Sequence, residues 1–268
     1  RLESRLTGTL QDVHATGLTA PEEDYFALMP VLACFILVVP FPRAESVWRM
    51  GFFDRDVPAK ERRRLMAFYR SCLQRHLYFH GPDKRLLSKN ASFAPLIGSL
   101  RETFPDARII CCMRDPVQTL PSQLSSLESG MRLFGSDPRD PLFRERMLAM
   151  MEFYYANLLE HLQRAPRDRA ALVAMDRLKD DLESTLTALY QRLGIALAPE
   201  FANVLSREAL RARSYATRHH YQLSDFRLDP QGIRSRFANV YDRFAFPSGE
   251  SPGQAPTQGA SGWAGEAS

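Results

Sequence analysis

The chain has only four cysteines among its 268 residues, and none of their spacings matches a zinc or redox motif. They are Cys34, Cys72, Cys111 and Cys112. Each lies in apolar surroundings, and Cys111 and Cys112 would face apart because neighbours in a strand point to opposite faces. We therefore expect small core residues and no metal site.

The sequence also has no long apolar run. Its longest, 31–41, lies between Pro30 and Pro42 and is too short to cross a bilayer. No signal peptide starts the chain. These features predict no membrane span within the chain and favour a cytoplasmic location, whereas a membrane anchor before Arg1 would place the protein on the lumenal side.

The sequence has no large excess of positive or negative side chains. The 35 lysines and arginines are nearly balanced by 31 aspartates and glutamates, for a net charge of +4. This balance does not argue for a nucleic-acid partner, but it is compatible with a polyanionic nucleotide or an acidic acceptor. With 45% hydrophobic residues the chain can bury a full core. We expect one domain over 1–247 and a disordered tail over 248–268.

The most informative segment is an apolar stretch followed at once by a polar turn. Residues 108–113 are typical of a parallel strand covered on both faces, and Arg114 follows directly. Asp115 then caps a helix that Pro116 opens. An arginine at this point presents a cationic fork beside the free N–H groups of a helix N-terminus, and together they suit a phosphate. Ser122 follows eight residues after Arg114.

The remaining pattern alternates helices and short strands without a repeat. Further strands are expected over 86–88 and 170–175, and further helices over 59–79, 93–103, 116–129, 141–164, 182–193 and from Pro230 onward. The first of these helices carries arginines on a solvated face at 62–64 and buries the stripe Leu65, Phe68, Tyr69, Cys72, Leu73 and His76. The last buries Ile233, Phe237, Val240 and Phe244. This order predicts a helix-rich, three-layer α/β fold with helices flanking a central parallel sheet.

Four segments occur in the order found in a known family. They are 20–25 (Ala-Pro-Glu-Glu-Asp-Tyr), 86–90 (Leu-Leu-Ser-Lys-Asn), 104–122 with Arg114 and Ser122, and 220–226 (His-Tyr-Gln-Leu-Ser-Asp-Phe). Together they resemble a diverse branch of the sulfotransferase superfamily, over the chain up to Phe246. The resemblance implies the P-loop NTPase-like sulfotransferase fold. It also implies the donor 3′-phosphoadenosine 5′-phosphosulfate (PAPS), whose 3′-phosphate Arg114 and Ser122 would bind.

One part of that family pattern is missing. Members of the superfamily open with a strand and a Gly- and Thr-rich loop that cradles the donor's 5′-phosphosulfate. The nearest match here, 7–9 (Thr-Gly-Thr), has no apolar strand before it and no basic residue. Since the chain also begins without methionine, we expect an N-terminally incomplete fold, from a fragment or a processed chain whose donor loop lies upstream. A genuinely shortened protein would have the same sequence.

Arg114 and Ser122 are the expected cofactor-binding residues. Arg114 could instead pair with Asp115 or cap the sheet edge, and a helical serine usually bonds its own backbone or water. Pro121 removes the helical hydrogen bond to the Val117 carbonyl and tends to kink the helix. Such a kink would either aim Ser122 at the phosphate or move it away.

Lys89 and Glu23 are the expected catalytic residues. The resemblance places Lys89 near the transferred sulfonate, where it would stabilise charge on the bridging oxygen as the S–O bond breaks; the alternative is a surface lysine. Cytosolic relatives carry a histidine base shortly after this lysine, but here Asn90 follows. Other branches use a carboxylate, and among Glu22, Glu23 and Asp24 we favour Glu23. Partial burial would raise the pKa of its carboxyl towards that of a general base.

Each of these choices has an alternative. The acids at 22–24 also suit an ordinary helix N-terminus, where they complement the helix dipole. His14 is a further candidate base. His219 and His220, next to Arg218, could contact a donor or an acceptor, or form a solvated basic loop.

Three functions fit these observations. The first is a sulfotransferase that moves a sulfonate from PAPS to a hydroxyl or amine acceptor by in-line displacement, without a metal. The second is a non-catalytic relative that keeps the fold as a binding module, which the missing loop and histidine favour. The third is a kinase-like enzyme, for which a phosphate-binding loop with its lysine and a carboxylate pair for magnesium are missing. We favour the first.

The acceptor is not identified by the sequence. An apolar acceptor pocket could be lined by aromatic residues that otherwise belong to the core. They are Phe41, Trp48, Phe52, Phe53 and Phe134.

Overall fold

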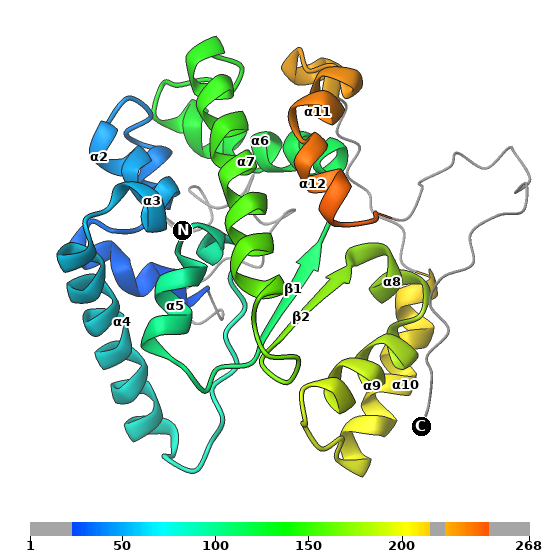
Figure 1. Ribbon diagram of the computed structural model, residues 1–268. Coiled ribbons are helices and arrows are strands. Elements are labelled where there is room, and N and C mark those ends of the chain that lie inside the picture. The colour runs from blue at the N-terminus through cyan, green and yellow to red at the C-terminus, as the bar shows by residue number, and fades with distance from the viewer. Residues whose placement is uncertain (1–22, 215–222, 247–268) are drawn as a thin grey trace, which may run out of the picture.

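A computed structural model describes residues 23–214 and 223–246, which form a helix-rich α/β structure around a small parallel sheet (Figure 1). In this part of the chain the sheet has two strands, β1 (Ile109–Met113) and β2 (Ala170–Ala174). Ile109 lies opposite Ala170 and Met113 opposite Ala174. The strands therefore end at the same edge, and β1 leads directly into Arg114.

Helices make up most of the rest. Before β1 lie η1 (Asp24–Val31), η2 (Phe35–Val38), α2 (Glu45–Trp48), η3 (Arg49–Phe52), α3 (Phe53–Asp56), α4 (Ala59–His80), η4 (Ala91–Leu96) and α5 (Ile97–Thr103). Between the strands lie α6 (Pro116–Leu133) and α7 (Pro141–Gln163). After β2 come α8 (Met175–Asp180), α9 (Leu182–Arg192), α10 (Pro199–Ser214), η5 (Leu223–Phe226), α11 (Pro230–Arg236) and α12 (Ala238–Arg243).

The two strands are covered differently. One face of the sheet packs against α5 and α7. On the other face, Ala171 and Val173 of β2 pack against α9, so three layers meet across β2. Ile110 of β1 is 39% exposed and Cys112 is exposed. The expectation that this strand is covered on both faces is therefore wrong, because α8, α9 and α10 gather beside β2 (Figure 1).

The core has two main parts. The larger joins η2, α2, η3, α6, α7, α11 and α12, and the smaller joins η1, α3, α4 and η4. Trp48, Phe52 and Phe53 are buried within these clusters, as the core interpretation predicts. Phe41 and Phe134 are 57% and 56% exposed and belong to the surface.

Most element predictions are confirmed, with shifts of one or two residues at several ends and an α6 that extends four residues beyond its predicted end at 129. Both predicted strands after residue 100 form, and the long helices over 59–79, 141–164 and 182–193 appear as α4, α7 and α9. Aspartates cap two helices: the Asp181 carboxylate accepts from the Ser184 N–H at the start of α9, and the Asp229 carboxylate accepts from the Gly232 N–H at the start of α11. Gly194 has φ of +59°, the left-handed conformation that ends α9.

The strand expected over 86–88 does not form. This segment is an irregular loop, and Leu87 is 93% exposed, so no sheet buries it. Side-chain hydrogen bonds of Ser88 and Asn90 to Asp24 fix the loop instead of a strand ladder.

Two details of α4 also differ from expectation. His76 is exposed instead of lying on the buried stripe, and Met66 is buried in addition to Leu65 and Tyr69. Arg62 is not a solvated side chain, because its Nη1 donates to the carbonyl oxygens of Asp54 and Val57 at 2.9 and 2.8 Å. It thereby satisfies carbonyls at the end of α3.

The helices near Pro95 and Pro230 each divide into two elements. The segment 93–103 begins as the 3-10 helix η4, which contains Pro95, and continues as α5. The helix from Pro230 stops at Arg236 and resumes as α12. Ile233, Phe237 and Val240 are buried as expected, whereas Phe244 is only half-buried.

Candidate active site

The turn after β1 combines a cap, a helix start and an exposed arginine. The Asp115 carboxylate accepts a hydrogen bond from the Val117 N–H at 2.8 Å, and Pro116 is the first residue of α6. Proline suits this position because its missing N–H would have no partner inside the helix. Arg114 is exposed, and its Nε donates to Oε1 of Gln118 at 3.3 Å. Its guanidinium therefore lies along the first turn of α6.

Ser122 lies on the same side of α6. Positions 114, 118 and 122 follow at intervals of four, so they lie roughly along one side of the helix. Ser122 is half-buried, and α6 continues through Pro121 without interruption to Leu133. Gln118 lies between Arg114 and Ser122 and is not among the site residues predicted from the sequence.

Two tyrosines hold this turn from other elements. The Tyr155 hydroxyl, on α7, donates to the Arg114 carbonyl oxygen at 2.6 Å. The Tyr241 hydroxyl, on α12, donates to Oδ1 of Asp115 at 2.6 Å. Burial, more than any other effect, raises the pKa of both phenols, and the Asp115 carboxylate raises that of Tyr241 further. Both hydroxyls therefore stay protonated and able to donate.

Glu23 and Lys89 are in direct contact. The Lys89 ammonium donates to Oε1 of Glu23 at 2.6 Å. The Glu23 side chain is 21% exposed and that of Lys89 is 78% exposed. Glu23 precedes η1 but makes no side-chain cap there, so its carboxylate is used for Lys89 and not for the helix N-terminus.

Asp24 fixes the loop that presents Lys89. Its carboxylate accepts from the Tyr69 hydroxyl at 2.5 Å, from the Ser88 hydroxyl at 2.9 Å and from the Asn90 amide. The Asn90 side-chain oxygen accepts from the Tyr25 N–H at 3.3 Å. Burial, together with Asp24, raises the pKa of Tyr69, which remains a donor. Residues on both sides of Lys89 are thus tied to the start of η1.

Helix α7 contributes two neighbouring buried tyrosines, Tyr154 and Tyr155. Burial raises the pKa of the Tyr154 hydroxyl, and the charge of Tyr25 raises it further. Its neighbour Tyr155 holds the Arg114 carbonyl.

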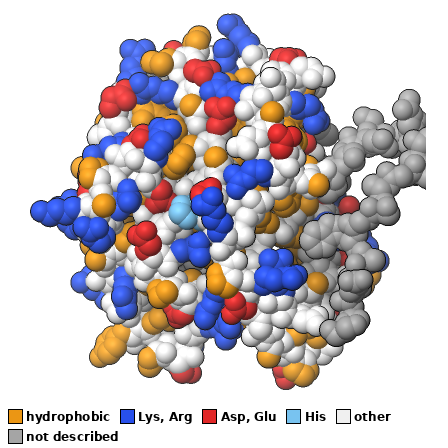
Figure 2. All heavy atoms as spheres, viewed as in Figure 1, with side chains coloured by type: hydrophobic (Ala, Val, Ile, Leu, Met, Phe, Trp, Pro, Cys, Tyr) orange, Lys and Arg blue, Asp and Glu red, His pale blue; other side chains and the backbone are white. Residues whose placement is uncertain are grey.

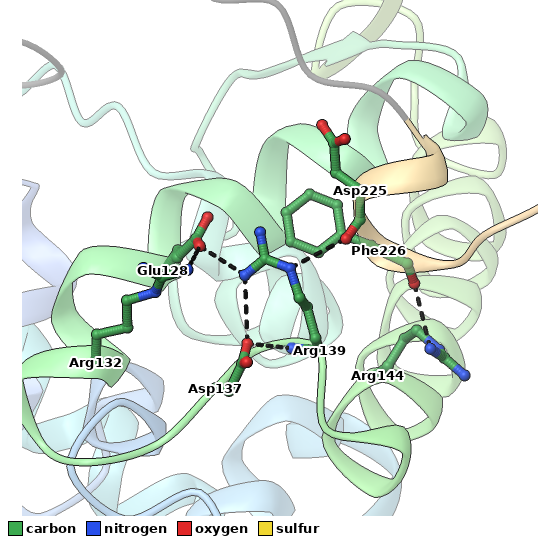
Figure 3. Close-up of polar contacts among 7 residues, drawn as sticks. All are labelled: Glu128, Arg132, Asp137, Arg139, Arg144, Asp225 and Phe226. Carbon is green, nitrogen blue, oxygen red and sulfur yellow. Dashed lines mark hydrogen bonds and ion pairs between the residues drawn. The ribbon is translucent and has the colours of Figure 1, made fainter.

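A third polar cluster attaches η5 to α6 and α7 (Figure 3). Arg139 donates from Nη1 to Glu128 at 2.6 Å and from Nε to the Asp225 carbonyl oxygen at 3.1 Å, and it lies over the Phe226 ring. The hydrogen bond that Arg139 donates to Glu128 raises the pKa of Arg139. Arg144 donates to the Phe226 carbonyl oxygen at 3.3 Å. The motif at 220–226 is therefore anchored through its second half.

The cysteines differ from the expected uniform core set. Cys34 is buried, Cys72 and Cys111 are half-buried, and Cys112 is exposed. Burial raises the pKa of Cys34 to about 11 and that of Cys111 to about 12. Over 23–214 and 223–246, no group of histidine, cysteine, aspartate and glutamate side chains is placed to hold a metal ion.

Several sequence candidates lie outside the described residues. They are Thr7, Gly8, Thr9, His14, Glu22, Arg218, His219, His220 and the segment 248–268. Among the helices that the structure describes, none is long and apolar enough to cross a membrane.

Comparison with known families identifies the class of protein. Residues 38–199 match the Sulfotransferase family, so the chain belongs to that family. This range contains Lys89, Arg114 and Ser122, whereas Glu23 precedes it. A search of curated proteins finds no match.

A solved structure shares the fold. It is the crystal structure of sulfotransferase STF9 from Mycobacterium avium, with a TM-score of 0.71 and 18% sequence identity. The match covers 92% of this chain and 64% of the STF9 chain. The likeness shows a sulfotransferase fold for a chain that spans about two thirds of the length of that structure.

Proposed function

We propose that the chain is a PAPS-dependent sulfotransferase that binds the 3′-phosphate of the donor at Arg114 and Ser122. The observation that carries the proposal is the exposed Arg114 guanidinium beside the N-terminus of α6. We propose for this chain the P-loop NTPase-like sulfotransferase fold, in which helices lie on both faces of a central parallel sheet.

The chemistry of the turn fits a phosphate. Of its five N–H groups, the Arg114 guanidinium uses one for Gln118, which leaves a fork for a bidentate contact. The neighbouring carboxylate of Asp115 would repel an anion, but it is engaged by the Val117 N–H and the Tyr241 hydroxyl. The dipole of α6 adds a favourable field at the same end of the helix.

Lys89 and Glu23 supply complementary groups for the transfer. An acceptor oxygen or nitrogen would attack the sulfur as the bond between sulfur and the phosphate oxygen breaks, giving the sulfonated acceptor and adenosine 3′,5′-bisphosphate. Lys89 has three N–H donors, of which Glu23 takes one, so two are left for the oxygen that gains charge. The Glu23 carboxylate would take the acceptor's proton.

Transfer of labelled sulfonate from PAPS to a set of phenols, sugars and amines tests the proposal. We expect Lys89→Ala to lower kcat by about 10²-fold or more, as for other charge-stabilising donors. Glu23→Gln should also abolish turnover while sparing donor binding. Lys84→Ala is the matched control, since Lys84 is an exposed lysine of the same loop and should not affect turnover. Loss of activity in this control, or full activity of both site variants, would refute the roles of Lys89 and Glu23.

A non-catalytic binding module is the second candidate function. It is favoured by Asn90, which follows Lys89 and whose amide is used for Asp24 and Tyr25 instead of for chemistry. Tight binding of adenosine 3′,5′-bisphosphate without transfer to any acceptor would establish this function in place of the first.

A further inference from the structure

A cavity of about 420 Å³ lies away from the candidate active site, between α2, η3, α3 and the first half of α7. Its volume is typical of sites for small organic molecules. Arg49, Arg55 and Arg146 line it, and Trp48 and Phe52 form its apolar part. Figure 2 shows basic and hydrophobic side chains close together over the region where Figure 1 shows α2 and α3.

The cavity is separate from the site around Arg114. Arg146 precedes Tyr155 by nine residues on α7, which corresponds to about 14 Å along the helix. Tyr155 is the residue that holds the Arg114 carbonyl. A ligand in the cavity and a phosphate at Arg114 would therefore occupy different places.

The arginines of the cavity have donors left over. Arg49 pairs with Glu61 at 2.8 Å, Arg55 with Asp56 at 2.7 Å, and Arg146 with Glu45. Two further donors are buried and have no hydrogen-bond partner among the described residues. They are Nε of Arg49 and Nη1 of Arg146. A buried donor without an acceptor is unfavourable, so an oxyanion that supplies acceptors would be stabilised here.

Aromatic rings orient two of the guanidinium groups. Arg55 lies 4.1 Å from the centroid of the Phe52 ring, and Arg146 lies 5.5 Å from that of Trp48. Such stacking fixes the plane of a guanidinium before a ligand arrives. Arg146 is therefore held in place before a ligand binds.

The acid that competes for Arg146 is exchangeable. The Glu45 side chain is 75% exposed, and an ion pair with so exposed a partner contributes little to stability. Glu45 could turn into solvent while an anion takes its place. While the Glu45 carboxylate stays at the cavity, its negative charge would weaken binding of the anion.

We propose that this cavity binds a small organic anion through one sulfate, phosphate or carboxylate group, which Arg49 and Arg146 hold, with the ligand's apolar part against Trp48 and Phe52. The proposal does not depend on sulfonate transfer. Removal of Glu45 should strengthen binding, whereas removal of either arginine should weaken it.

Titration with phenyl phosphate tests the proposal, with inorganic phosphate as the probe without an apolar part. Trp48 fluorescence is the readout in a chain that carries Trp263→Phe, since the sequence has two tryptophans. We expect Arg146→Gln and Arg49→Gln each to raise Kd at least tenfold. Glu45→Gln should lower Kd by a few fold, and phenyl phosphate should bind more tightly than inorganic phosphate.

The control is Arg114→Ala, which should leave this Kd unchanged. Binding that Arg114→Ala weakens instead belongs to the site at α6 and overturns the proposal. An unchanged or raised Kd in Glu45→Gln also overturns it, and this exposed position does not depend on the arginine variants folding. Absence of any saturable fluorescence change in the parent chain would have the same meaning.

Discussion

The turn after β1 and the loop that carries Lys89 are both fixed by tyrosine hydroxyls, but they are built over different distances in sequence. In the turn, Asp115 and Pro116 start α6 within a few residues of Arg114, and tyrosines from α7 and α12 are added. In the loop, the hydrogen bonds between residues 88–90 and residues 23–25 join positions 64 to 66 apart. A local start makes the first site recognisable in sequence, whereas the second depends on the tertiary fold.

The largest effect is expected at Asp24 of η1, whose carboxylate holds the loop. Asp24→Ala would leave the buried Tyr69 hydroxyl and two neighbouring donors without their acceptor. We expect the free energy of unfolding to fall by about 3 kcal/mol, measured by urea denaturation. Glu23→Ala is the control, because its partner Lys89 is exposed and should contribute less than about 1 kcal/mol. Equal losses in both variants would contradict the central role of Asp24.

The turn should be less sensitive to a single change. Tyr155→Phe removes the donor to the Arg114 carbonyl and should lower the free energy of unfolding by about 2 kcal/mol. It should also weaken binding of adenosine 3′,5′-bisphosphate, because Arg114 is no longer held. Tyr78→Phe, at a side chain that is 88% exposed, is the neutral control. If Tyr155→Phe behaves like this control, the turn is fixed by its local sequence alone.

A pH effect should be seen in both regions, because each lies near one thiol whose pKa is raised by burial. Cys34 packs near η1, and Cys111 lies in β1. Their pKa values are raised to about 11 and about 12, while an unfolded thiol titrates near about 8.5. The folded state thus keeps protons that the unfolded chain releases. The stability they contribute is complete below about pH 8.5 and is lost as the pH rises towards 11 and 12.

Urea denaturation under reducing conditions at about pH 8 and about pH 10 measures this loss. Cys34→Ala should reduce it by about 2 kcal/mol, and so should Cys111→Ala. A loss that is unchanged in both variants would show that other groups carry the pH dependence.

The smallest effect is expected at Ser122. A neutral hydroxyl contact to a phosphate contributes about 0.5–1 kcal/mol, so Ser122→Ala should raise the Kd for adenosine 3′,5′-bisphosphate about two- to fivefold. Ser126→Ala, one turn further along α6, should leave it unchanged. If the two variants are equivalent, Pro121 has turned Ser122 away from the phosphate.

Features with a local signal could be predicted from the sequence, whereas features that depend on distant residues could not. Local signals mark several elements that form: the strand over 108–113, the long helices, and the caps at Asp115, Asp181 and Asp229. The expected strand at 86–88 has a similar apolar pattern but is wrong, since distant partners on η1 decide its conformation. No local signal marks Leu87 as exposed.

The site shows the same division. The resemblance supplied the motifs from which four site residues could be predicted: Arg114, Ser122, Lys89 and Glu23. The structure shows Lys89 and Glu23 in contact. Tyr69, Tyr155 and Tyr241 could not be nominated. They lie 45, 41 and 126 positions from the groups they hold, and a tyrosine on a helix is indistinguishable in sequence from an ordinary core residue.

The most direct test of the donor site is calorimetric titration of Arg114→Ala with adenosine 3′,5′-bisphosphate and with adenosine 5′-monophosphate. Loss of one charge-assisted contact of about 1.5–3 kcal/mol predicts at least tenfold weaker binding of the bisphosphate, with the monophosphate little changed. Arg108→Ala, at the other end of the same strand region, should change neither. Equal weakening of both nucleotides by Arg114→Ala would contradict the assignment of Arg114 to the 3′-phosphate.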